Sequence, residues 1–134
     1  MDIKPKVGVV SCSGECCSLG TLSRIATRLA LEEKYDQTVT ICLPLFLAGE
    51  TEEHGFAKEH PTISVDGCGK LCAMKAITKY SKKPVESVNV EELLRQWGAK
   101  APDGRRMLDS EGLKLANRLA KLLAERVDTI QEAS

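Results

Sequence analysis

Two segments of this 134-residue chain follow one pattern, in which an apolar run is followed by a glycine-containing stretch with two cysteines four residues apart. Residues 9–17 carry Cys12 and Cys16, and residues 65–73 carry Cys68 and Cys72. A short apolar run that ends in a glycine-containing loop is typical of a buried parallel strand. The repeated pattern therefore predicts an α/β domain in which both cysteine pairs follow strands.

Strand-like and helix-like patterns alternate along the rest of the chain. Strands are expected at 7–11, 38–43, 62–65 and 85–90, and helices at 21–33, 69–80, 90–97 and from 109 onward. Residues 45–58 are expected to form a helical connection or a mobile lid. The alternation predicts one domain over residues 1–134, with a small, mostly parallel sheet of about four strands. Helices should cover both faces in three layers, as in half of a Rossmann or flavodoxin-like fold.

The two cysteine pairs are expected at the same edge of this sheet. Ligands of open α/β sheets bind beyond the carboxyl ends of the strands, where the strand order reverses. Both pairs follow directly on a strand. If the first and third strands are neighbours, Cys12, Cys16, Cys68 and Cys72 should lie together.

Composition narrows the class of partner. Lys plus Arg equal Asp plus Glu at 19 each, so no net charge favours nucleic acid or an anionic membrane. We find no secretory signal and no membrane span, which predicts a cytoplasmic protein whose six cysteines are reduced. In that compartment, closely spaced cysteines more often bind metal or perform redox chemistry. Whether the chain is a monomer or a homodimer stays open.

The four paired cysteines fit three kinds of chemistry. Zinc favours tetrahedral thiolate sites with short spacings between paired ligands, and we favour it. An iron–sulfur cluster uses the same four thiolates. Thiol redox or covalent catalysis is the third possibility, although three residues separate each pair where thioredoxin-type motifs have two. A phosphatase-like cysteine loop is excluded because Ser18 and Met74 stand where its arginine would be.

Whether the protein is an enzyme is not decided by these residues. A closed shell of four thiolates argues against hydrolysis, since catalytic zinc keeps a position open for water. The metal would then serve structure, metal handling or metal sensing. Alternatively, the metal only stiffens the loops of an interaction module, whose final helix or 45–58 connection recognises a partner. That alternative predicts an exposed apolar patch on the final helix.

Several other residues have open or ordinary roles. Cys42 is expected to be a small buried hydrophobe inside its strand, and Cys17 is a spare ligand, a resolving thiol or a packed side chain. Asp66 is a helix cap, a base or a hydrogen-bond acceptor beside the ligands. His54 and His60 are expected to be surface residues rather than ligands.

The chain resembles the DGC-domain family, which takes its name from the tripeptide Asp66-Gly67-Cys68. The resemblance spans most of the chain and rests on Cys12-Ser13-Gly14 with Cys16, Cys42-Leu43-Pro44, Val65 to Cys68 with Cys72-Ala73, and Trp97-Gly98-Ala99-Lys100. It implies zinc binding through Cys12, Cys16, Cys68 and Cys72, and it assigns no reaction. No role for Lys100 follows from it.

Overall fold

The computed structural model describes residues 4–134, and Met1–Ile3 lie outside the described part. A four-stranded sheet forms the centre of the fold, and all of its strand pairs are parallel. The strands are β1 (Val7–Ser11), β2 (Thr38–Thr40), β3 (Thr62–Asp66) and β4 (Glu86–Asn89), in the order β2-β1-β3-β4. This order is that of the first four strands of flavodoxin-like folds, and it confirms the expected parallel α/β sheet.

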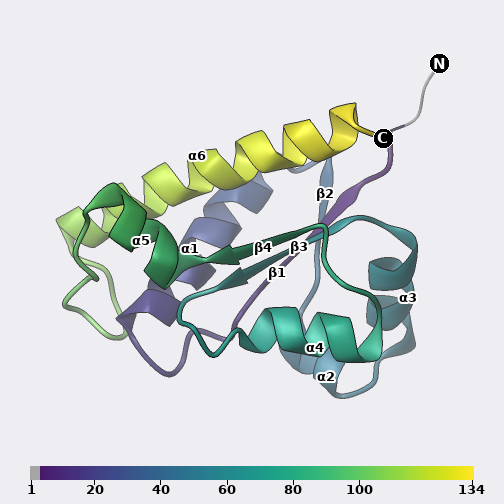
Figure 1. Cartoon of the computed structure of the whole chain (residues 1–134), viewed down its shortest axis with the longest axis horizontal. Helices are drawn as coiled ribbons and strands as arrows, with labels where there is room; N and C mark the ends of the chain where they lie inside the picture. Colours follow the sequence, from purple (N-terminus) through teal and green to yellow (C-terminus); the bar gives the residue numbers. More distant parts are fainter. Residues whose placement is uncertain (1–3) are drawn as a thin grey trace.

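Helices cover both faces of the sheet and give the three expected layers (Figure 1). The helices are α1 (Ser18–Glu33), α2 (Leu43–Leu47), α3 (Thr51–Glu59), α4 (Cys72–Tyr80), α5 (Val90–Trp97) and α6 (Ser110–Glu132). The long α6 packs along α1 and, with α5, lies on one side, whereas α2, α3 and α4 lie on the other. Within residues 4–134, no helix combines the length and apolar character needed to cross a membrane.

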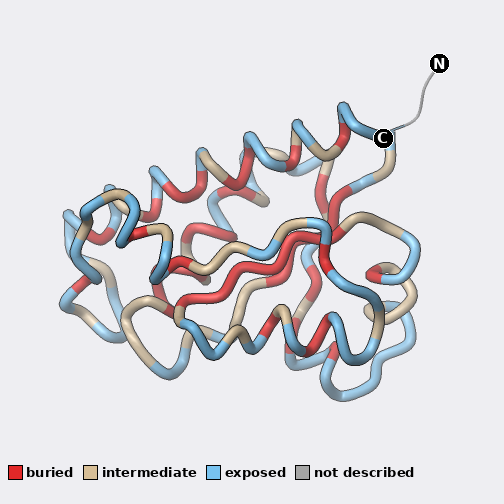
Figure 2. Tube along the Cα trace, viewed as in Figure 1, coloured by how far each residue is buried: buried red, intermediate tan, exposed pale blue. Residues whose placement is uncertain are grey.

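Each face of the sheet has its own apolar core, and the buried strands lie between them (Figure 2). Val9 packs with Leu22 and Leu119 on the α1–α6 side, whereas Val10 packs with Phe46 on the other side. Successive strand residues point to opposite faces, so the continuous apolar run of β1 serves both cores. The central strands are thereby held firmly, and their carboxyl ends are well placed to position loops.

Two expected element boundaries were wrong near cysteines. β2 ends at Thr40, so Cys42 lies outside the strand, at the residue before α2. Pro44 occupies the first turn of α2, a position where proline costs no hydrogen bond. The 45–58 connection is accordingly built of two short helices, α2 and α3.

The second cysteine pair is likewise not on one helix. α4 begins at Cys72, whereas a start near Gly69 was expected. Leu71 adopts a left-handed backbone with φ of 53° and ψ of 47°, which interrupts any helix at that point. Cys68 therefore lies in a loop outside α4 and shares no helical face with Cys72.

Candidate functional site

Five of the six cysteines line one cavity of about 240 Å³ at the carboxyl edge of the sheet. The cavity lies where β1 and β3 end, which is the point where the strand order reverses. We call it the cysteine cavity; its cysteines are Cys12, Cys16, Cys17, Cys68 and Cys72. The structure thus brings together all four cysteines of the two sequence motifs, as the neighbouring positions of β1 and β3 require.

The first cysteine loop is fixed to β3 through hydrogen bonds. The backbone N–H of Cys12 donates to the carbonyl of Val65 at 2.9 Å. The Cys12 thiol lies 3.7 Å from the hydroxyl oxygen of Ser23 on α1, and that buried hydroxyl donates to the same Val65 carbonyl. Cys12 is therefore oriented by both α1 and β3.

Three glycines let both cysteine loops pack closely on the start of α1. A Cβ added to Gly67 would lie 2.5 Å from the backbone nitrogen of Gly20, closer than real side chains allow. One added to Gly20 would lie 2.9 Å from the Cα of Gly14. Gly14 also has φ of 76°, which favours glycine. Both cysteine loops therefore pack backbone to backbone on Gly20, in the first turn of α1.

The second cysteine loop ends in a tight turn held by its backbone. The N–H of Leu71 donates to the carbonyl of Cys68 at 3.2 Å. The left-handed conformation of Leu71 costs about 1–2 kcal/mol for a residue with a side chain. This unfavourable turn directs the chain from Cys68 into α4, whose first residue is Cys72.

Asp66 caps α4 from the last position of β3. Its carboxylate accepts hydrogen bonds from the backbone N–H groups of Ala73 at 2.7 Å and Met74 at 3.1 Å. The side chain is 1% exposed, and this burial raises the pKa of Asp66, while the two hydrogen bonds and Lys75 lower it in part. Of the three roles that the sequence left open for Asp66, helix capping is the one seen in the structure, and it ties the end of β3 to the helix that carries Cys72.

The donor types at the cavity suit a thiophilic metal. All six cysteines are free thiols, and Cys16 and Cys72 are exposed, so their side chains have room to rotate. As the side chains stand, no three His, Cys, Asp or Glu residues within 4–134 are close enough to hold a metal ion. The four motif thiols thus surround one cavity without meeting at one point.

The family follows from comparison with known proteins. The family model described as the DGC domain matches residues 8–109. The chain belongs to the DGC domain family. Comparisons with curated proteins and with solved structures find no match. Within the matched range of the DGC domain lie both cysteine motifs and the tripeptide 66–68.

Three other residues of this DGC domain lie away from the cysteine cavity. His54 contacts the Phe46 carbonyl at 2.6 Å and His60 stacks on Phe56, so both histidines contact residues of α2 and α3. Lys100 forms an exposed ion pair with Asp103 at 3.3 Å. His54, His60 and Lys100 are therefore not among the residues that line the cysteine cavity.

The expectation that Cys42 is a small buried residue inside a strand was wrong. It is half-buried and lines a second, larger cavity, to which Cys12 also contributes. Its position after β2 matches those of Cys12 after β1 and Cys68 after β3. Pro44 could have indicated this position, because proline is favoured in the first turn of a helix and so allows a helix to begin directly after Cys42.

Proposed function

We propose that the DGC domain binds one zinc ion through Cys12, Cys16, Cys68 and Cys72 and acts in metal handling or metal sensing. The observation that supports this proposal is that these four free thiols line one cavity at the point where the strand order reverses. Four thiolates suit zinc in charge and softness. Bound zinc would hold both loops to each other by linking the two cysteine pairs.

The arrangement of the loops favours a site that gains and loses metal over a purely structural site. Residues 4–134 build two buried cores from strands and helices without any contribution from the cysteine cavity. A metal at the loops would therefore add local order to a domain with its own core. Exposure of Cys16 and Cys72 gives an entering ion or a metal-donating molecule direct access to two ligands.

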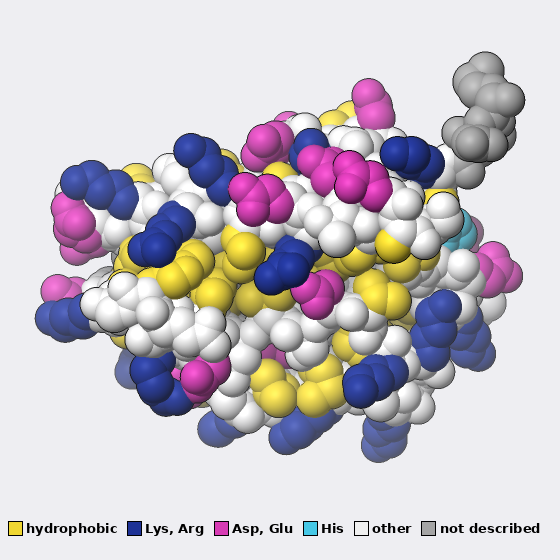
Figure 3. Space-filling model, turned by 45° about the horizontal axis from the view of Figure 1, so that its top comes forward, with side chains coloured by type: hydrophobic (Ala, Val, Ile, Leu, Met, Phe, Trp, Pro, Cys, Tyr) yellow, Lys and Arg dark blue, Asp and Glu magenta, His cyan; other side chains and the backbone are white. Residues whose placement is uncertain are grey.

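An interaction module built on α6 is less well supported. Among the large hydrophobic residues exposed within 4–134, Leu113 is the one on α6. Basic and acidic side chains are interspersed over the visible face (Figure 3), which does not favour a partner of either charge.

The first test is the metal content and the ultraviolet–visible spectrum of protein purified without oxygen. We expect about one zinc per chain and no visible absorption. Iron with inorganic sulfide and a brown colour would instead establish the cluster alternative, which uses the same cysteines.

Replacing each proposed ligand with serine tests the ligand set. Cys12→Ser, Cys16→Ser, Cys68→Ser and Cys72→Ser should each lower zinc affinity by at least about tenfold, because a neutral hydroxyl replaces a thiolate. Cys42→Ser is the matched control and should retain full zinc occupancy. Metal per chain is measured after dialysis against a competing chelator. Full retention in all four single variants would rule out the four-ligand site.

A further inference from the structure

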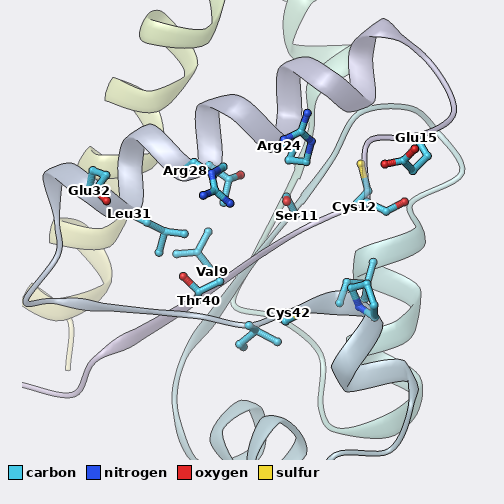
Figure 4. A pocket seen from close by; sticks show the side chains of 15 residues that line it. Val9, Ser11, Cys12, Glu15, Arg24, Arg28, Leu31, Glu32, Thr40 and Cys42 are labelled. Carbon is cyan, nitrogen blue, oxygen red and sulfur yellow. The ribbon is translucent and has the colours of Figure 1, made fainter. Parts of the chain in front are cut away.

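A second cavity, of about 450 Å³, lies between α1 and the carboxyl ends of β1 and β2. We call it the arginine cavity, because Arg24 and Arg28 project from α1 over Val9, Ser11 and Thr40 (Figure 4). Its volume falls in the range of pockets that hold small molecules. Cys12 and Cys42 also line it, so it adjoins the cysteine cavity at Cys12.

The two arginines are available to bind an anion. They are one helical turn apart and so project from the same face of α1. Within residues 4–134, neither guanidinium forms an ion pair. Glu15 and Glu32 line the same cavity, but they lie toward its two ends, with the arginines between them (Figure 4). Two neighbouring positive charges without a partner favour a bound anion.

Thr27 gives an independent indication of a ligand. It lies between the two arginines in sequence, lines the same cavity and is 3% exposed. Its Oγ1 is buried and has no hydrogen-bond partner in the described part of the chain. A buried hydroxyl without a partner is unfavourable, and such groups in folded proteins call for an explanation. A ligand oxygen in the cavity would supply the missing partner.

We propose that the arginine cavity binds a small organic oxyanion, a carboxylate or a phosphate, through Arg24 and Arg28. The Thr27 hydroxyl donates a further hydrogen bond to it. Since Cys12 lines both cavities, the bound molecule lies beside one of the four proposed metal ligands. This inference goes beyond zinc binding, because the arginine cavity needs no metal to hold an anion, and each proposal can fail without the other.

Alkylation of Cys42 tests the proposal in the full-length protein as purified. Iodoacetate is an anion, iodoacetamide is its neutral analogue, and with either one the thiolate displaces iodide as an S–C bond replaces the C–I bond. Cys17 is the internal reference, since it is also half-buried and outside the proposed zinc ligands but lines only the cysteine cavity. We expect the ratio of iodoacetate to iodoacetamide rates, measured by peptide mass spectrometry, to be about tenfold higher at Cys42 than at Cys17.

Competition separates a binding site from a general positive potential. Succinate and inorganic phosphate should each be tested for saturable protection of Cys42 against iodoacetamide, with sodium chloride at equal ionic strength as the control. Protection by succinate alone indicates a carboxylate ligand, and protection by phosphate alone indicates a phosphate ligand. Equal rate ratios at Cys42 and Cys17, or protection no better than that of chloride, would overturn the proposal.

Two variants complete the test. Arg24→Gln with Arg28→Gln should abolish the excess iodoacetate rate at Cys42 and leave Cys17 unchanged. Thr27→Val should weaken the protection about tenfold, because a hydrogen bond to a charged group is lost. It should not lower the thermal stability, because it removes a hydroxyl that lacks a partner. A Thr27→Val protein with unchanged protection would exclude the hydroxyl as a donor to the anion.

Discussion

Replacement of Gly67 by alanine is expected to push the 66–72 loop away from the start of α1 and to lower the free energy of unfolding by about 1–3 kcal/mol. The added Cβ would lie 2.6 Å from the carbonyl carbon of Leu19 and 2.7 Å from the Cα of Gly20. Both are backbone atoms of α1, so no side-chain rotation relieves the overlap. The strain must move the 66–72 loop, α1 or both.

The same substitution at Gly69 provides a matched control in the same loop. A Cβ there would meet the Glu91 carboxylate oxygen at 3.7 Å, an ordinary contact, and neither glycine has a positive φ. Gly69→Ala should therefore change stability by no more than about 0.5 kcal/mol. Unfolding is measured by denaturant titration with chelator present, so that metal binding does not contribute. Equal stabilities of the two variants would contradict the close approach at Gly67.

The same two variants bear on the proposed zinc site. If zinc needs both loops, Gly67→Ala should lower zinc affinity, whereas Gly69→Ala should not. A Gly67→Ala protein that is destabilised but binds zinc normally would show that the 66–72 loop can move away from α1 without loss of the ligand set.

The position of the cysteine cavity was predictable because it depends on local sequence patterns and on the rule that ligands bind at the carboxyl edge of a parallel sheet. The apolar runs before Cys12 and Cys68 marked β1 and β3, and parallel strands present their carboxyl ends at one edge. The contact of Gly14, Gly20 and Gly67 was not predictable, since it joins residues of different elements and depends on the tertiary packing of α1.

The arginine cavity was missed for a different reason. In sequence, Arg24 and Arg28 are ordinary polar residues between the apolar positions of an amphipathic helix. They line a cavity only because β2 ends at Thr40, which leaves Cys42 at the cavity instead of inside a strand. The strand was expected to run three residues further, and that difference places Cys42 at the cavity instead of inside the sheet. The ends of an element are the part that a sequence pattern predicts least well.

Asp66→Ala is expected to lower the free energy of unfolding by about 2–4 kcal/mol. The substitution leaves the N–H groups of Ala73 and Met74 without the carboxylate that accepts from them at 2.7 and 3.1 Å. Asp109→Ala is the control, because Asp109 caps α6 through the N–H of Gly112 but is exposed. Its loss should cost about 1 kcal/mol. Equal losses would show that burial adds nothing to the Asp66 cap.

The pH dependence of stability distinguishes the charge of Asp66 from its hydrogen bonds. Burial raises the pKa of Asp66 above the usual 3.8, so the native state binds this proton more tightly than the unfolded state. The stability contributed by Asp66 is therefore greatest below its unfolded pKa, decreases as the pH rises through the raised pKa, and is constant above it. Asp66→Asn keeps one acceptor oxygen but has no carboxyl proton to lose. Denaturant unfolding should be measured from below the usual pKa of 3.8 to neutral pH. The stability of the wild-type protein should fall relative to that of Asp66→Asn as the pH rises. A difference between the two proteins that does not change with pH would refute the raised pKa.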